Sequence, residues 1–183
     1  MTTGYRIDHP SNAYFLTFTV VDWVDIFSRK IYRDIVIDSF KYCRSFKGLK
    51  VWGYVIMTNH VHSILIAQQN NLPDIIRDFK RHTASTILKS IQTPEESRRD
   101  WMMKRFEFAA KSNVRNSTHQ LWTHDNRAKE LVSEKFTMQK LDYIHLNPVR
   151  AGFVDKAEDW IYSSARNYLY LPALMDVDIM DIS

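Results

Sequence analysis

Two apolar segments flank Thr58-Asn59 in Trp52–Ile66, WGYVIMTNHVHSILI, and this pattern predicts two strands joined by a tight turn. Side chains alternate between the two faces of a strand, so His60 and His62 share one face of the second strand, about 6–7 Å apart. Neutral imidazoles at this spacing are suited to binding one metal ion. The alternative interpretation is two incidental histidines beside a turn.

Elements on both sides of this hairpin give a mixed pattern of helices and strands. Aromatic and β-branched residues predict a strand over 14–21, and apolar spacing predicts helices over 31–46, from Pro73 to the break at Thr93-Pro94, and over 96–111. A short strand is expected over 120–123. A last helix is expected over 136–147, because the residue before Pro148 disfavours helical backbone.

The core order of these elements, β, α, β, β, α, β, α, begins with the split βαβ pattern. We therefore expect an α+β fold: a ferredoxin-like sandwich with an antiparallel sheet, helices on one face, and an additional C-terminal helix. The 183 residues suit a single domain over 1–183, with a short acidic tail over 171–183. A single cysteine, Cys43, excludes an internal disulfide framework. The chain begins without an apolar signal core and has no long apolar run, so we expect a cytoplasmic protein without membrane contact.

The whole chain has a net charge of +4, and its basic residues are concentrated in one part of the sequence. Eight basic and four acidic residues lie between Arg77 and Arg105. This segment is either a solvated helix face or a surface that contacts nucleic-acid phosphates. The candidate phosphate contacts are Arg77, Lys80, Arg81, Arg98 and Arg99.

Tyr143 and Asn147 lie four residues apart in the last predicted helix, so they project from one face. Together with the two histidines they could form a metal-assisted nucleophilic site. The Asn147 carboxamide would then be a third metal ligand at a helix C-terminus, where partial negative charge favours a cation. The alternative interpretation is a packing tyrosine followed by an asparagine that ends the helix. We interpret His82 and His145 as structural histidines.

The sequence also resembles a known family. His60-Val61-His62, followed by YIHLNPVRAG at Tyr143–Gly152, is similar to the single-tyrosine HUH transposases, and most of all to the REP-associated tyrosine transposases. Residues 14–29, 71–80, 96–102 and 160–168 resemble the same branch, so the similarity covers about residues 12–170.

The resemblance implies a site and a chemistry. In this family two histidines and an amide on the tyrosine helix hold Mg²⁺ or Mn²⁺ against a phosphate of single-stranded DNA, and the tyrosine attacks it to form a 5′-phosphotyrosine. The implied metal ligands are His60, His62 and Asn147, although many members carry glutamine at the last position. Tyr143 is the implied nucleophile.

The expected function is therefore that of a metal-dependent single-stranded DNA endonuclease and strand transferase acting on hairpin or repeat DNA. One alternative is a catalytically silent, domesticated protein that binds hairpin DNA. Another is an RNA-binding ferredoxin-like domain, which typically carries outward-facing aromatic residues on its central strands. Relatives often form homodimers, so Tyr143 is expected to face the histidines either of its own chain or of a partner.

Overall fold

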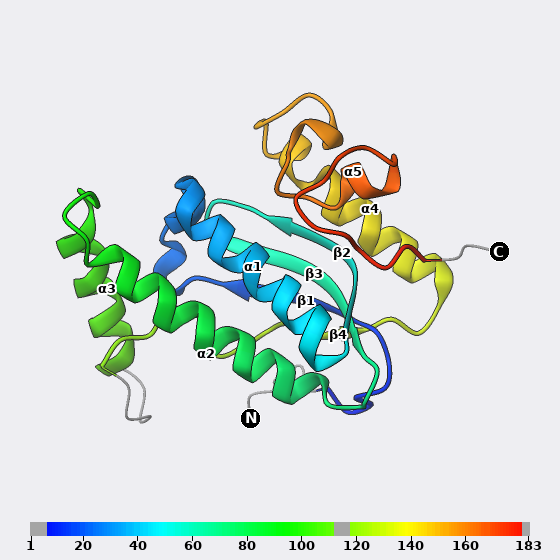
Figure 1. Cartoon of the computed structure of the whole chain (residues 1–183), viewed down its shortest axis with the longest axis horizontal. Coiled ribbons are helices and arrows are strands. Elements are labelled where there is room, and N and C mark those ends of the chain that lie inside the picture. Colours follow the sequence, from blue (N-terminus) through cyan, green and yellow to red (C-terminus); the bar gives the residue numbers. More distant parts are fainter. Residues whose placement is uncertain (1–6, 112–117, 181–183) are drawn as a thin grey trace.

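A four-stranded antiparallel sheet forms the centre of the computed structural model, which describes residues 7–111 and 118–180 (Figure 1). Its strand order is β2-β3-β1-β4. The strands are β1 (Tyr14–Thr19), β2 (Leu49–Ile56), β3 (His60–Ala67) and β4 (Lys129–Glu130). This is the order that the split βαβ pattern generates, and the predicted ferredoxin-like α+β fold is confirmed.

Helices α1 (Lys30–Lys47) and α2 (Leu72–Ile91) cover one face of this sheet (Figure 1). Leu16 and Phe18 of β1 point toward these helices and are fully buried. Phe40 of α1 stacks on Phe79 of α2 with ring centroids 4.6 Å apart. Gly48 ends α1 with a left-handed backbone, φ 66°, as a C-terminal glycine commonly does. The main hydrophobic core therefore lies between the sheet and these two helices.

Helix α4 (Glu134–Arg150) packs on the opposite face of the sheet and forms a second, smaller core. Its residues Leu141 and Ile144 contact β-strand side chains that alternate away from the main core. These strand residues include Phe15, Val55 and Ile64. The helix comes close to β2 because Gly53 has no side chain: a Cβ there would lie 2.7 Å from Leu141 Cδ1.

Two predictions in the C-terminal half of the chain are wrong: one strand and the end of the last helix. Residues 120–123 form no strand; Trp122 makes one isolated bridge to Val20, and the fourth strand is β4. The intervening segment follows the edge of β1 irregularly, through bonds such as Thr17 N to Asn126 O at 2.8 Å. The last helix does not stop at Asn147 but runs through Pro148 to Arg150. Proline is tolerated there because it removes only one backbone hydrogen bond in the final turn.

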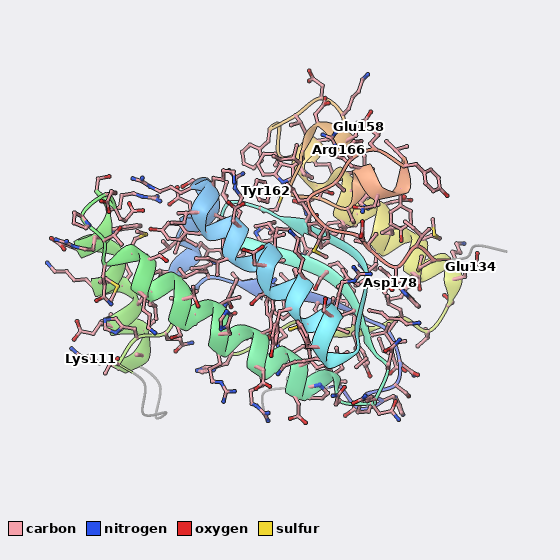
Figure 2. All side chains as sticks on the ribbon, viewed as in Figure 1. Lys111, Glu134, Glu158, Tyr162, Arg166 and Asp178 are labelled. Atoms are coloured by element: carbon pink, nitrogen blue, oxygen red, sulfur yellow. The ribbon has the colours of Figure 1, made fainter. Side chains whose placement is uncertain are left out.

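The remaining elements are the helix α3 (Arg99–Lys111) and four short ones: η1 (Val21–Trp23), η2 (Ile26–Ser28), η3 (Ala157–Asp159) and α5 (Ala165–Tyr168). The acidic C-terminal segment folds back onto the domain. Figure 2 labels Asp178 of this segment. Its carboxylate accepts a hydrogen bond from Val51 N at 2.9 Å and pairs with Arg44 at 3.2 Å. Within the described ranges, no helix is both long and apolar enough to cross a membrane.

Candidate metal and nucleophile site

The two histidines of β3 lie side by side on the sheet face that α4 covers only in part. Their ring centroids are 4.6 Å apart. His60 Nδ1 lies 2.7 Å from the Asn59 side-chain oxygen, and His62 Nδ1 lies 2.9 Å from Thr17 Oγ1. The asparagine oxygen can only accept, so His60 carries its proton on Nδ1 and leaves the Nε2 lone pair available. A hydrogen bond of this kind fixes the ring of a metal-binding histidine.

Burial keeps both imidazoles neutral. It lowers the pKa of His60 to about 4, with a further contribution from the Arg127 charge. Burial also lowers the pKa of His62 to about 3, and the charges of His60, Lys140 and Arg127 act in the same direction. The neutral form is the one that binds metal ions, so the pair is in its ligating state at pH 7.

Tyr143 of α4 reaches this pair within the same chain. Its hydroxyl oxygen lies 3.4 Å from His62 Nε2, and its ring meets the His62 ring at a centroid distance of 5.1 Å. The Tyr143 ring also makes a T-shaped contact with Phe15 of β1, with centroids 5.9 Å apart. Packing against two rings holds the phenol in place. The structure thus brings His60, His62 and Tyr143 together without a second subunit.

Asn147, the predicted third ligand, lies one helical turn beyond Tyr143. It is half-buried and does not line the pocket that contains the other three residues. In the described part of the chain, no three His, Cys, Asp or Glu side chains gather in a way that could hold a metal ion. The donor set of two neutral imidazoles fits a divalent ion that takes its remaining ligands from water and from substrate oxygens. Ligation by Asn147 stays a prediction.

Basic side chains surround the nucleophile and the histidines. A pocket of about 460 Å³ has His60, His62 and Tyr143 in its wall. The same wall holds three cations, Arg127, Lys129 and Lys140, and none of its residues in the described chain is acidic. Such a surface attracts anions, and phosphate groups in particular. Helical spacing could have identified Lys140, which lies three residues before Tyr143, whereas Arg127 and Lys129 belong to the irregular edge segment and β4.

The basic residues predicted on α2 are engaged within the chain instead. Arg77 and Arg81 pair with the Asp78 carboxylate at 3.5 and 2.9 Å. Lys80 donates to Thr123 O at 2.7 Å and to the Asn126 side-chain oxygen at 2.6 Å, which ties α2 to the edge segment. None of these three cations lines the histidine pocket. DNA contact by this face stays a prediction.

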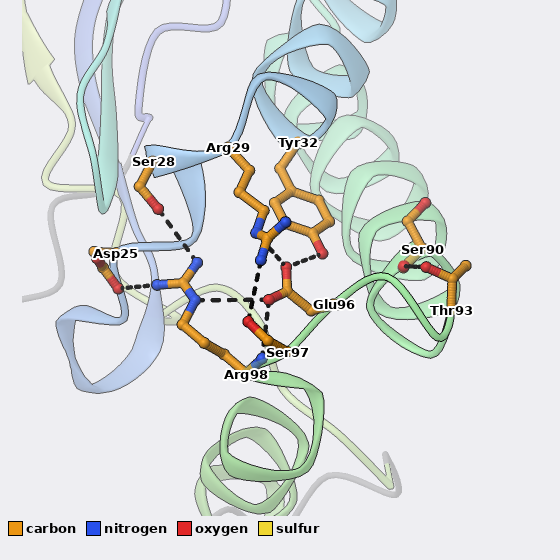
Figure 3. A network of polar contacts seen from close by, with 9 residues as sticks. All are labelled: Asp25, Ser28, Arg29, Tyr32, Ser90, Thr93, Glu96, Ser97 and Arg98. Carbon is orange, nitrogen blue, oxygen red and sulfur yellow. Dashed lines mark hydrogen bonds and ion pairs between the residues drawn. The ribbon is translucent and has the colours of Figure 1, made fainter.

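Arg98 and Arg99, the remaining predicted phosphate contacts, also have partners in the chain. Arg99 lies 3.0 Å from the neighbouring Asp100. Arg98 pairs with Asp25 at 2.7 Å and lies 3.7 Å from the buried Glu96 carboxylate. Glu96 is the centre of a network that also includes Arg29 and Tyr32 (Figure 3). This network joins the start of α1 to the start of α3, and for this reason the helix predicted from residue 96 begins only at residue 99.

His145 of α4 has the structural role that we expected. Its Nε2 lies 2.9 Å from Ser164 Oγ, and this hydroxyl also accepts a hydrogen bond from Tyr54 N at 2.9 Å. Burial lowers the pKa of His145 to about 4, so the ring is neutral at pH 7. This contact fixes α4 to the segment that runs antiparallel alongside the second half of β2. It therefore helps to set the height of Tyr143 above the sheet.

Comparison with known proteins identifies the fold. No protein-family model and no curated protein matches the sequence. Among solved structures, the chain is similar to a REP-associated tyrosine transposase bound to a REP hairpin, with a TM-score of 0.61 and 17% identity over 100% of this chain and 96% of that one. A proposed transposase from Deinococcus radiodurans is 19% identical over 79% of this chain and 95% of its own, with a TM-score of 0.43. The chain thus has the fold of a REP-associated tyrosine transposase, as the resemblance in its sequence implied.

Proposed function

We propose that the chain is a metal-dependent endonuclease and strand transferase for single-stranded or hairpin DNA, with Tyr143 as its nucleophile. The observation that carries the proposal is the 3.4 Å distance between the Tyr143 hydroxyl and His62 Nε2, made between α4 and β3 of one chain. The cations of the pocket support a polyanionic substrate. The fold shared with a transposase bound to a REP hairpin supports hairpin DNA as its form.

The proposed reaction transfers a phosphate from DNA to the phenol oxygen and back. The Tyr143 oxygen bonds to phosphorus while the bond from phosphorus to the 3′ oxygen breaks, which leaves a 5′-phosphotyrosine and a free 3′ hydroxyl. The phenol proton passes to solvent, because His62 with a pKa of about 3 is too weak a base to hold it. Solvent in turn protonates the departing 3′ oxygen. A 3′ hydroxyl can later attack the phosphotyrosine and rejoin the DNA without ATP.

His60 and His62 would hold a divalent metal, Mg²⁺ or Mn²⁺, through their Nε2 atoms. Such an ion, when bound, stabilises charge on a phosphate and orients it. Imidazole ligands suit ions softer than Mg²⁺, so we expect Mn²⁺ to be at least as effective. The chain's own part is to bind the phosphates with Arg127, Lys129 and Lys140. It also holds the Tyr143 ring against Phe15 and His62.

A second candidate function is binding of hairpin DNA without cleavage. It is favoured by one observation, the position of Asn147 outside the pocket wall, which leaves the metal with two protein ligands there. The RNA-binding alternative has less support, because Phe15, the aromatic residue of β1 on this face, is only 5% exposed beneath α4. A homodimer is compatible with a site built within one chain but is not required by it.

Formation of a covalent adduct separates the two functions. End-labelled hairpin DNA with a single-stranded flank is incubated with the protein in Mn²⁺ and resolved on a denaturing gel. We expect a protein–DNA band with the wild type and with Tyr170→Phe, a control at an exposed phenol outside the pocket. We expect no band with Tyr143→Phe or His60→Ala, although Tyr143→Phe should bind the hairpin as well as the wild type.

Two results would contradict this assignment. A covalent band that persists in Tyr143→Phe would mean that another residue is the nucleophile. A wild-type protein that binds the hairpin tightly but never forms the band would instead support the silent DNA-binding function.

A further inference from the structure

Trp23 presents its indole at the edge of the histidine pocket. Its side chain is 58% exposed, and its ring centroid lies 6.4 Å from that of His60. Trp23 belongs to the wall of the same pocket as Tyr143. A single exposed aromatic residue is common on protein surfaces and needs no explanation by itself. The backbone that presents this one does need an explanation.

The chain adopts a left-handed backbone at Asp22 and Trp23, with φ of 52° and 54°. Bulky residues rarely take this conformation, which favours glycine. Of the five non-glycine residues with positive φ in the described chain, two line this pocket: Trp23 and Arg127, whose φ is 45°. Such conformations persist only where the surrounding structure enforces them, and they are concentrated at functional sites.

Asn59 connects the Trp23 backbone to His60, one of the two candidate metal ligands. Its side-chain nitrogen Nδ2 donates to Trp23 O at 3.4 Å, while its side-chain oxygen accepts from His60 Nδ1 at 2.7 Å. The Asn59 carbonyl also accepts from Val20 N at 3.0 Å, which fixes the start of the Trp23 loop to the β2–β3 turn. One residue thus contacts both the ring that would bind metal and the loop that carries the indole.

We propose that Trp23 is a stacking platform for one unpaired base of the DNA strand whose phosphate lies at the histidines. The exposed indole offers a flat surface, and every base has a face that can stack on it whatever its identity. Arg127, in the same pocket wall, binds the backbone phosphate of the stacked nucleotide. This inference rests on the proposed function and adds a binding subsite to it. The ligand class is a single-stranded nucleotide beside the scissile position.

The test measures binding without cleavage, in a Tyr143→Phe background. The ligand is hairpin DNA with a single-stranded flank, intact or with one abasic site moved stepwise along the flank. On intact DNA we expect Trp23→Ala to weaken binding by roughly five- to one hundredfold, the usual effect of removing a stacking aromatic residue. When the abasic site lies at the stacked position, the Tyr143→Phe parent protein should bind as weakly as Trp23→Ala binds intact DNA. On that abasic DNA, Trp23→Ala should bind no worse than the parent protein.

Matched variants separate stacking from folding. Tyr170 is also an exposed aromatic residue with a left-handed backbone, φ 56°, but it lies outside the pocket wall, so Tyr170→Ala should not change binding. Trp23→Phe keeps a ring and should retain most of the affinity. Trp23→Gly suits the left-handed backbone, so it should unfold at or near the parent's temperature while binding as weakly as Trp23→Ala.

Three outcomes would overturn the inference. Trp23→Ala and Trp23→Gly could bind like the parent, they could lose affinity equally on intact and on every abasic DNA, or their weaker binding could follow a large loss of thermal stability. Each of these leaves the proposed function intact if the wild type still forms its covalent adduct. A wild type that neither binds nor cuts the hairpin refutes both.

Discussion

Replacement of Gly53 by alanine tests whether close packing of α4 on β2 positions Tyr143. The new Cβ would lie 2.7 Å from Leu141 Cδ1, whereas ordinary contact begins at 3.4 Å, so the Leu141 methyl group or the helix must move by about 0.7 Å. Overpacking of this kind typically costs about 1–3 kcal/mol of stability. Tyr143 lies two residues beyond Leu141, and a misplacement of about 1 Å can reduce a reaction rate by about 100-fold.

A double-mutant cycle with Leu141→Ala makes this reasoning quantitative. Leu141→Ala alone should cost about 2–5 kcal/mol, because it leaves a cavity in the smaller core. In that background the nearest remaining atoms to a Cβ at residue 53 are Ser164 Oγ at 3.5 Å and Ile144 Cδ1 at 3.7 Å, which are ordinary contacts. Gly53→Ala should then cost almost nothing, or even stabilise slightly, since alanine restricts the unfolded strand more than glycine does.

Chemical unfolding gives the stability of the four proteins, and the rate of adduct formation on hairpin DNA gives the position of Tyr143. We expect Gly53→Ala to slow adduct formation more than it weakens DNA binding, since the cations of the pocket remain. Equal costs of Gly53→Ala in the two backgrounds would refute the clash with Leu141. A wild-type rate in a destabilised Gly53→Ala protein would refute the link between this packing and the nucleophile.

Two further predictions concern charge. Lys140→Ala should reduce the salt dependence of single-stranded DNA binding: the slope of log binding constant against log salt concentration should fall in magnitude by about 0.7, the value for one phosphate contact. Arg81→Ala should leave this slope unchanged. The opposite result would place the DNA along α2. Burial alone raises the pKa of Glu96, but hydrogen bonds from Tyr32 and Arg98 N and the charges of Arg29 and Arg98 outweigh it, so the pKa lies below its usual range. Because the folded-state pKa is depressed, this stabilisation is present above the unfolded pKa of about 4.3 and is lost as pH falls through the folded pKa. Thermal unfolding scanned downward from pH 6 should therefore show a smaller acid-induced loss of stability in Glu96→Gln than in the wild type, and equal losses would contradict this account.

The pleat of one strand was enough to predict that His60 and His62 share a face, because alternation is a local property of the backbone. Their distance from Tyr143 could not be derived in this way. The phenol lies 81 positions from His62 in sequence, and it arrives there because α4 packs over Gly53. Residue chemistry made a shared site conceivable, and the resemblance of the two motifs to a known family supported it, but neither gave the distance.

Other parts of the site carry no periodic signal at all. Arg127 lies in the irregular segment that replaced the predicted strand over 120–123, and Trp23 lies in a loop whose left-handed backbone no propensity favours. The predicted phosphate contacts on α2 and near α3, by contrast, had a clear signal in the sequence that did not reveal their partners within the chain. Charge density marked them, but pairing within the chain depends on tertiary neighbours such as Asp78 and Glu96, which sequence spacing does not reveal.

The two faces of the sheet differ in role: one carries the main hydrophobic core, and the other carries the candidate site. The face under α1 and α2 carries the large aromatic core, in which Phe79 contacts both Phe18 and Phe40. On the other face a smaller cluster that includes Leu141, Ile144 and Phe15 packs α4 against the strands, and the pocket that contains His60 lies beside it. A buried polar site would weaken a main core, since unpaired polar groups are costly there. At the edge of a small core, the imidazoles keep their Nδ1 partners while their side chains line a basic pocket. Substitutions of the histidines or of Tyr143 should therefore affect cleavage well before they affect folding.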